Sequence, residues 1–292
     1  MAADDLAAHE PAEPARKDDK PPMDWWAEAR GLLWLVLAVL GFHSFIAKPF
    51  YIPSESMMPG LLVGDRLVVT KYPYGYSFVT PTFHLMPYVP GRLFGSLPER
   101  GDVVIVTPPG ERTDYIKRVV GLPGETIEVE GGQLLIDGVP VERRAMGVRS
   151  VPVDANTQCS ALQYPGAYSE TPQGAVCRLP IFRETLPNGR SYDTIDLGYR
   201  GEASGDDYGP VLIPEGHVFL MGDNRDASAD SRFSVAERGL GGPVPWENIG
   251  GRAEFITFSL DGTATLNPLS WFASFRSGRA GTSLAPEREA VE

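Results

Sequence analysis

A run of 17 residues without a charged side chain constrains this chain more than any other feature. Gly31 to Ala47 contains no Asp, Glu, Lys or Arg. As an α-helix this stretch covers roughly 26 Å, slightly less than the ~30 Å hydrocarbon core of a bilayer. Aromatic residues that suit the two membrane interfaces flank it: Trp25, Trp26, Phe50 and Tyr51. The sequence therefore predicts a transmembrane helix over residues 31–47.

Two other interpretations of this stretch are a buried helix of a soluble domain and a cleaved signal peptide. A helix that is apolar on every face and follows a polar tail is more typical of a membrane span. For cleavage, Ala47 is the only small residue at a suitable point, and Phe45 stands where a second small residue is needed. An uncleaved anchor is favoured.

Residues 1–30 lack apolar periodicity and are rich in Ala, Pro, Asp, Glu and Lys, which predicts a disordered tail. Orientation follows from basic residues near the span, and acidic residues contribute little to that rule. We expect the tail to be cytoplasmic and the rest of the chain to lie on the other side of the membrane. The basic residues are Arg16, Lys17, Lys20 and Arg30 before the span, and only Lys48 and Arg66 in the next twenty residues.

The overall composition excludes some classes of function. The net charge of −12 argues against nucleic acid as a main partner, because phosphate binding needs a basic surface. The two cysteines, Cys159 and Cys177, form no Cys-x-x-Cys pair, so we expect no zinc site on thiols and no metal or cofactor. The 32 Gly and 27 Pro predict many short strands and turns.

Beyond the span the pattern is that of a mainly β protein: an antiparallel β domain over 48–142 and 211–276, interrupted by an inserted lobe. Asp137-Gly138 is a strong hairpin signal between two short strands. The expected strands are Arg66–Thr70, Asp102–Val106, Tyr115–Val120, Thr126–Glu130, Gln133–Ile136, Val139–Glu142, His217–Met221 and Arg252–Ser259.

Three further segments have a weaker pattern. Residues 143–210 are predicted to form the inserted lobe, of β and irregular structure, and 277–292 a disordered tail. The aromatic segment 72–98 is either an ordinary core loop or a membrane-interface segment. If the body faces an oxidising compartment, Cys159 and Cys177 should form a disulfide. Two free buried thiols are the alternative.

Four short motifs carry the chemical information. Taken singly, a Ser in a turn or a Lys in a strand is most often a solvated residue. The motifs are Ile52-Pro-Ser-Glu-Ser-Met-Met-Pro59 with Gly64-Asp65, Arg100-Gly-Asp102, Asp114-Tyr-Ile-Lys-Arg-Val-Val-Gly-Leu-Pro-Gly124, and Met221-Gly-Asp-Asn-Arg-Asp-Ala-Ser-Ala-Asp-Ser-Arg232. In this order, however, they resemble those of the bacterial type I signal peptidase (leader peptidase) family, over roughly residues 30–142 and 211–260. The resemblance implies that the chain beyond the span lies on the outer face of a bacterial inner membrane.

The resemblance implies a serine endopeptidase with a Ser/Lys dyad that removes signal peptides from exported preproteins after a small-x-small motif. Ser56 matches the nucleophile and Lys117 the general base. The supporting matches are Ser54 for the oxyanion, Ser228 for orienting the lysine, Asp230 and Arg232 for bracing the loop, and Phe50, Ile52 and Ile116 for the substrate pockets.

Lys117 can act as a base only if its surroundings remove its charge, because an ordinary lysine is protonated at neutral pH. Its neighbours in the strand are apolar except Arg118, which alternation directs to the other face. Glu55 and Gly60 depart from the family pattern, where Gly and Thr are common. The role of Glu55 beside the nucleophile has no explanation in the sequence.

Other catalytic classes lack their motifs. The sequence has no Gly-x-Ser-x-Gly elbow, no His-Glu-x-x-His, and neither Asp-Thr-Gly nor Asp-Ser-Gly. Two alternatives to signal peptide cleavage stay open. One is a related peptidase with another substrate, such as a pilin or a conjugation-transfer protein. The other is a catalytically silent, membrane-tethered β module that binds export machinery. The intact Ser56 and Lys117 count against the second. The expected partners are preprotein signal peptides and the lipid bilayer.

Overall fold

The computed structural model describes residues 24–84 and 86–288, and the chain divides after Val39 into two compact units. Helix α1 spans Trp25–Phe45. It begins six residues before the predicted start because Asp24 caps it: its Oδ1 accepts hydrogen bonds from the N–H groups of Trp26 and Ala27. Ala47 opens a strand instead of ending the helix. Residues 24–30 therefore differ from the predicted disordered tail, and residues 1–23 lie outside the described residues.

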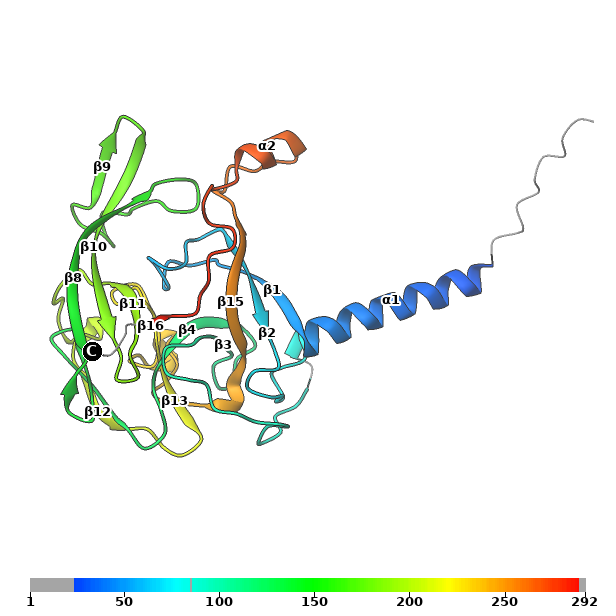
Figure 1. Ribbon diagram of the computed structural model, residues 1–292, viewed down its shortest axis with the longest axis horizontal. Helices are drawn as coiled ribbons and strands as arrows, with labels where there is room; N and C mark the ends of the chain where they lie inside the picture. The colour runs from blue at the N-terminus through cyan, green and yellow to red at the C-terminus, as the bar shows by residue number, and fades with distance from the viewer. Residues whose placement is uncertain (1–23, 85, 289–292) are drawn as a thin grey trace, which may run out of the picture. The chain divides into compact units, whose positions relative to one another are not determined.

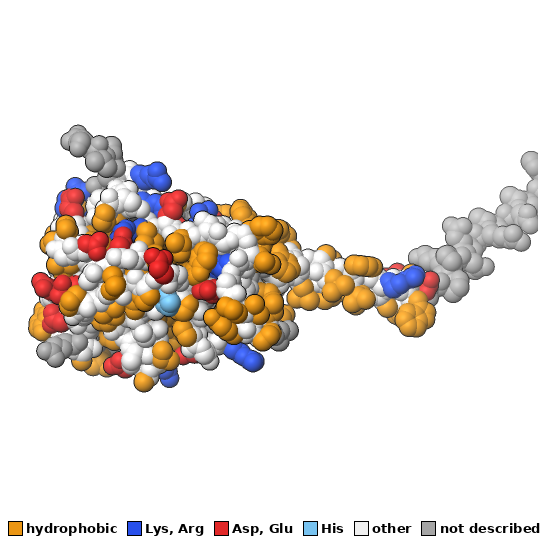
Figure 2. Space-filling view, turned by 90° about the horizontal axis from the view of Figure 1, so that it is seen from below, with side chains coloured by type: hydrophobic (Ala, Val, Ile, Leu, Met, Phe, Trp, Pro, Cys, Tyr) orange, Lys and Arg blue, Asp and Glu red, His pale blue; other side chains and the backbone are white. Residues whose placement is uncertain are grey.

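Helix α1 is long and apolar enough to cross a membrane. Its 21 residues correspond to about 32 Å of helix, which matches the hydrocarbon core of a bilayer. Apolar side chains cover its length (Figure 2), and the apolar window within it is not buried by protein. The prediction of one apolar helix followed by a β body is confirmed.

The catalytic sheet of the second unit has seven strands, each antiparallel to its neighbours, in the order β1-β2-β15-β3-β4-β13-β14. β15, near the centre of Figure 1, joins the segments before and after the inserted lobe. The strands are β1 (Ala47–Tyr51), β2 (Asp65–Thr70), β3 (Val103–Val106), β4 (Tyr115–Gly121), β13 (His217–Met221), β14 (Val244–Pro245) and β15 (Ile249–Ser259).

A smaller four-stranded sheet contains the predicted hairpin. Its order is β12-β5-β6-β7, with β5 (Thr126–Glu130), β6 (Gln133–Ile136), β7 (Val139–Pro140) and β12 (Tyr208–Leu212). The hairpin turn has φ of 53° at Asp137 and 74° at Gly138. Both angles are positive, as the two-residue turn signalled by Asp-Gly requires.

The inserted lobe is more regular than its sequence indicated. β8 (Glu142–Pro152), β10 (Gly174–Thr185) and β11 (Arg190–Ile195) form an antiparallel sheet, with β9 (Tyr168–Thr171) beside β10. These strands gather at the other side of the body from β1 and β2 (Figure 1). The lobe belongs to the same compact unit as the catalytic sheet, over residues 40–292. Its core contains Met58 and Leu62 of the loop between β1 and β2.

The C-terminal segment differs from the disordered tail predicted over 277–292, as far as residue 288. β16 (Glu287–Arg288) pairs with β11, and Leu284 is buried in the same core as Ile256 of β15. The backbone of Leu284 also bonds that of Glu254. The pairing of β16 with β11 and the burial of Leu284 hold this segment in place. Its sequence is too polar to show a strand pattern. Before it, a short helix α2 covers Pro268–Ala273.

Candidate active site

Two buried side chains from separate motifs meet beside the catalytic sheet. Ser56 lies in the loop between β1 and β2 and is 5% exposed, and Lys117 lies on β4 and is 4% exposed. Lys117 Nζ donates a hydrogen bond to Ser56 Oγ at 3.0 Å. Sixty-one residues separate the two in sequence, so their contact depends on the fold. The geometry is that of a nucleophile with an adjacent base.

Burial changes the ionisation of Lys117. Loss of solvent lowers its pKa from 10.5 to about 8, against the opposing effect of the Asp230 and Asp223 carboxylates. At pH 7 a pKa of about 8 leaves roughly a tenth of the amines neutral, whereas the ordinary value leaves fewer than about one in a thousand. Lys117 can therefore accept a proton at neutral pH.

Strand alternation separates Lys117 from the charge next to it, as expected. Arg118 turns to the other face of β4, where its Nε and Nη2 donate to the Asp223 carboxylate at 2.7 and 2.6 Å. Arg118 is buried as well, so the pair is an internal ion pair and not a solvated one. Lys117 consequently faces Ser56 and the ring of Tyr115, whose centroid is 5.7 Å from Nζ.

Ser54 is exposed and its Oγ lies 3.4 Å from Ser56 Oγ. The hydroxyl is therefore on the solvent side of Ser56 Oγ. Together with the backbone N–H of Ser56 it provides two donors that can face a developing oxyanion.

Ser228 does not make the hydrogen bond to Lys117 that the family resemblance implied. It is 5% exposed, and its Oγ has no hydrogen-bond partner among the described residues. Lys117 Nζ directs its bond to Ser56 instead. Ser228 is nevertheless packed tightly at the site: a Cβ on Gly222 would lie 2.1 Å from Ser228 Oγ and 2.5 Å from the Ser56 carbonyl oxygen. Only glycine fits at position 222.

Asp230 and Arg232 form a buried pair behind this loop. Arg232 donates from Nε and Nη2 to the two Asp230 oxygens at 2.9 and 3.0 Å, and Asp230 also accepts from the Gly222 N–H. Burial disfavours the charge of Asp230, but the Arg232 guanidinium and these hydrogen bonds keep its pKa below the usual range. Arg232 further donates to the Arg225 carbonyl. The pair thus ties the two ends of the last motif together.

An open pocket of about 350 Å³ adjoins the dyad. Phe50, Ile52 and Ile116, the three predicted pocket residues, all line it, together with Ser56 and Lys117. Ala227 and Ala229 complete the wall on the side of the last motif, which sequence reasoning had not singled out. The pocket is mainly apolar, and its walls lie beside Ser56.

The structure joins Cys159 and Cys177 by a disulfide in the inserted lobe. It also gives Glu55 a partner that sequence reasoning missed: Tyr164 of the same lobe donates a hydrogen bond from Oη to Glu55 Oε2 at 2.8 Å. Tyr164 has no local signal, because it lies in a segment without periodicity, 109 residues from Glu55. Over the described ranges, no group of three or more His, Cys, Asp or Glu residues is arranged to hold a metal.

The family follows from comparison with known proteins. A family model described as "Signal peptidase, peptidase S26" matches residues 25–258. Signal peptidase I of Rickettsia typhi is 36% identical over 238 residues, 80% of each chain. That of Rickettsia akari is 34% identical over 242 residues, 81% of this chain and 79% of its own.

A crystal structure of a signal peptidase I from Enterococcus faecalis is also similar. It matches 54% of this chain and 97% of its own, at 21% identity and a TM-score of 0.27. The assignment rests on the family model and the two rickettsial relatives. The protein is a serine peptidase, a hydrolase. The chain belongs to the signal peptidase family, peptidase S26.

Proposed function

We propose that this protein cleaves signal peptides from exported preproteins after a small-x-small motif, with Ser56 as nucleophile and Lys117 as general base. The observation that carries the proposal is the 3.0 Å contact between Lys117 Nζ and Ser56 Oγ inside a buried site that lowers the lysine pKa to about 8. A scaffold protein has no use for a buried amine poised on a serine, because such burial costs stability.

The acylation step uses groups that are all present. Neutral Lys117 takes the proton of Ser56 Oγ as this oxygen attacks the carbonyl carbon of the scissile peptide bond. The oxyanion that forms faces the Ser56 N–H and the Ser54 hydroxyl. The Lys117 ammonium then returns the proton to the leaving amine, and the C–N bond breaks. The mature protein leaves, and the signal peptide stays as an ester on Ser56.

Hydrolysis repeats the same roles with water. Lys117, neutral again, accepts a proton from a water molecule that attacks the ester carbonyl. Collapse of the second tetrahedral species breaks the bond to Ser56 Oγ, which recovers its proton from Lys117. Every proton transfer passes through one amine, so the reaction requires no other titrating group.

The pocket beside the dyad supports selection of small residues. Ile52 is 1% and Ile116 6% exposed, and both are β-branched, so their side chains are stiff walls. Residues larger than Ala, Gly or Ser at substrate positions −1 and −3 would clash with these walls. Burial alone would equally suit two core residues, but both side chains also border the open pocket.

The membrane arrangement is part of the proposal. The basic residues before α1 and in its first turns favour a cytoplasmic N-terminus and a catalytic unit on the outer face. In the aromatic segment 72–98, Tyr74 is buried, as expected for a core loop. Phe83, Tyr88 and Phe94 are exposed, as expected for a membrane-interface segment. A second apolar stretch, at α2, is also exposed and supports contact with lipid. Its exposed residues are Leu266, Leu269, Trp271, Phe272 and Phe275.

The function is tested by incubating the full-length protein, in detergent or liposomes, with a purified preprotein and sequencing the new N-terminus. Cleavage directly after the small-x-small motif is expected, with loss of cleavage when the −1 alanine of the substrate is replaced by leucine. Cleavage elsewhere, or none by well-folded protein, would contradict the proposal. Parallel incubation with a pilin-type precursor tests the related substrate class.

A further inference from the structure

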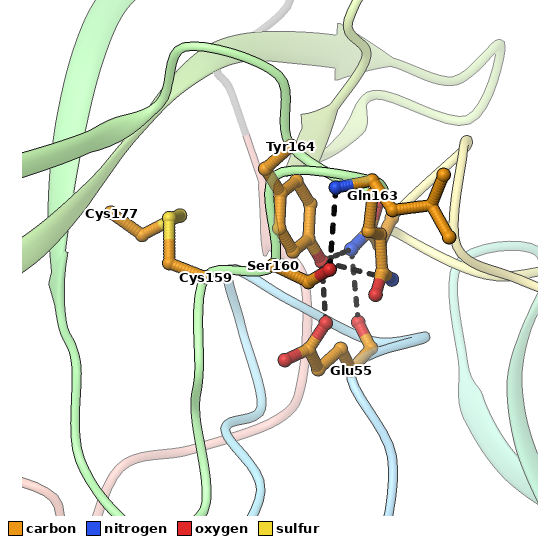
Figure 3. Close-up of a disulfide and its surroundings, with 8 residues drawn as sticks. Glu55, Cys159, Ser160, Gln163, Tyr164 and Cys177 are labelled. Carbon is orange, nitrogen blue, oxygen red and sulfur yellow. Dashed lines mark hydrogen bonds between the residues drawn. A yellow bond between two sulfur atoms is a disulfide. The ribbon is translucent and has the colours of Figure 1, made fainter.

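Glu55 precedes the proposed nucleophile, and its side chain is held by the inserted lobe. The Tyr164 hydroxyl donates to Glu55 Oε2 at 2.8 Å, as Figure 3 shows. Tyr164 is 1% exposed, so its hydroxyl has lost water and depends on protein partners. This buried contact joins the lobe to the residue next to Ser56.

Asn224 connects the same hydroxyl to the backbone of the loop between β1 and β2 that carries Ser56, called the catalytic loop below. Its Nδ2 donates to Tyr164 Oη at 2.8 Å and to the Glu55 carbonyl at 3.2 Å. Its backbone N–H donates to the Ser56 carbonyl at 3.1 Å. Asn224 belongs to the Gly-Asp-Asn-Arg motif and is fully buried. Asn224 therefore holds the carbonyl groups of both Glu55 and Ser56, and Tyr164 holds the side chains of Glu55 and Asn224.

The disulfide fixes Tyr164 in turn. Cys177 lies on β10, and the bond ties β10 to Cys159 at the start of the turn that carries Tyr164. The Tyr164 N–H donates to the Ser160 carbonyl at 2.7 Å, one residue beyond Cys159. Both cysteines and Tyr164 share one core with Met58 of the catalytic loop. Figure 3 shows the disulfide between Cys159 and Cys177 beside the turn that carries Tyr164.

We infer that Tyr164, held by the Cys159–Cys177 disulfide, is a positioning residue that sets the Ser56 backbone through Glu55 and Asn224. The inference rests on the proposed role of Ser56 as nucleophile. It accounts for Glu55, whose carboxylate accepts the hydroxyl that the lobe presents. It also makes full activity conditional on an oxidised lobe, so a chain with free thiols is a slower enzyme. Small displacements of a nucleophile are costly, because reacting atoms must lie within a narrow range.

The first test is Tyr164→Phe, which removes the hydroxyl and keeps the ring in the lobe core. We expect kcat to fall about tenfold with little change in KM. The matched control is Tyr74→Phe: Tyr74 is equally buried and donates to a carboxylate, Asp102, at 2.7 Å, but contacts neither Ser56 nor Lys117. It should lose comparable thermal stability and keep its kcat. If Tyr164→Phe kept the wild-type kcat, or if both variants lost kcat equally, the inference would be overturned.

A double-mutant cycle tests whether the effect passes through Glu55. Glu55→Ala and Tyr164→Phe should each lower kcat about tenfold, and the double variant should lose no more than either single variant. Glu55→Gln, which keeps an acceptor oxygen for Tyr164, should restore most of the activity. Additive losses would assign the two residues separate roles and would contradict an effect of Tyr164 that passes through Glu55.

The third test removes the disulfide. Alkylation of unreduced protein followed by mass spectrometry should leave both cysteines unmodified. Cys159→Ser with Cys177→Ser should then lower kcat about tenfold, and should add little to Tyr164→Phe. Reduction of the wild type by a dithiol, which passes two electrons and two protons to the disulfide, should do the same and leave the double serine variant unaffected. Full kcat in folded protein without the disulfide, or two alkylated cysteines in active wild type, would contradict the conditional role.

Failure of this inference and failure of the proposed function give different results. If Ser56→Ala abolishes cleavage while Tyr164→Phe retains the wild-type kcat, only the positioning role is wrong. If Ser56→Ala still cleaves, the nucleophile itself is wrongly assigned.

Discussion

Two lysines of this protein are buried to the same degree, and within the described residues only one of them forms a hydrogen bond with a hydroxyl. Lys71 is 3% and Lys117 4% exposed, and burial is the main cause that lowers each pKa to about 8. Lys117 Nζ lies 3.0 Å from Ser56 Oγ. Lys71 Nζ makes no hydrogen bond within the described chain and lies 5.6 Å from the Phe50 ring centroid. A shifted pKa is therefore not a sign of catalysis by itself; the neighbouring hydroxyl is what makes Lys117 a candidate base.

The largest expected effect separates the two lysines by substitution. Lys117→Met and Ser56→Ala should each lower kcat/KM by about 10⁴ or more, because the dyad acts as a unit. Lys71→Met should stay within about threefold of wild type, since its amine reaches no hydroxyl. Cleavage assays with circular dichroism as the folding control check this. Turnover by well-folded Lys117→Met would remove the difference between the two sites.

A smaller loss is expected for the oxyanion donor. Ser54→Ala should reduce kcat by about 10²–10³, as for removal of one oxyanion-hole donor, with KM little changed. Steady-state kinetics of Ser54→Ala beside Ser56→Ala provide the measurement. An equally complete loss in both variants would require the two serine roles to be exchanged.

The surroundings of Lys117 also include an open pocket, and its wall can be changed without touching the dyad. Ile116→Ala should deepen the pocket and admit Val or Leu at substrate position −1 or −3, while cleavage after Ala persists at a similar rate. Cleavage of a preprotein library, with sequencing of the products, reads out the selectivity. Unchanged selectivity in a stable, active variant would place Ile116 in the core alone.

The smallest effect concerns stability, where the two lysines should behave alike. A lysine whose folded pKa is near 8 and unfolded pKa near 10.5 binds more protons when unfolded, so stability rises with pH through this window. Below pH 8 the full penalty of burying the charge is present. Lys71→Met should remove it and raise Tm by about 5 °C at pH 7, with the gain fading above pH 10. Thermal melts from pH 6 to 10 test this; an unchanged or lower Tm at pH 7 would contradict it.

The features that could be predicted from the sequence are those that depend on residues close together in the chain. The Asp137-Gly138 turn and the strand before it follow from backbone preferences of neighbouring residues, and the apolar helix follows from composition. The strand after the turn ends at Pro140 and not at the predicted Glu142. Ser56 and Lys117 were found only through a family resemblance, because 61 residues separate them. Spacing alone would have treated Lys117 as an exposed strand residue.

What the sequence did not predict depends on contacts between distant segments. Tyr164 reaches Glu55 across 109 residues from a region without periodicity. The burial of Leu284 depends on β15 and could not be read from a polar tail. The burial of Lys71, which directly follows β2, is a tertiary effect as well. Such contacts leave no pattern in one sequence, since each partner alone resembles an ordinary surface residue.

The central claim is that neutral Lys117, and not merely a buried lysine, is the base that activates Ser56. The most direct measurement is the pH dependence of kcat/KM, from pH 6 to 10, in Lys71→Met, where Lys117 is the remaining buried lysine of the described chain. We expect kcat/KM to rise about tenfold per pH unit and to level off above about pH 8, with the same midpoint as wild type. A flat profile between pH 6 and 8, or a midpoint that disappears when Lys71 is replaced, would contradict it.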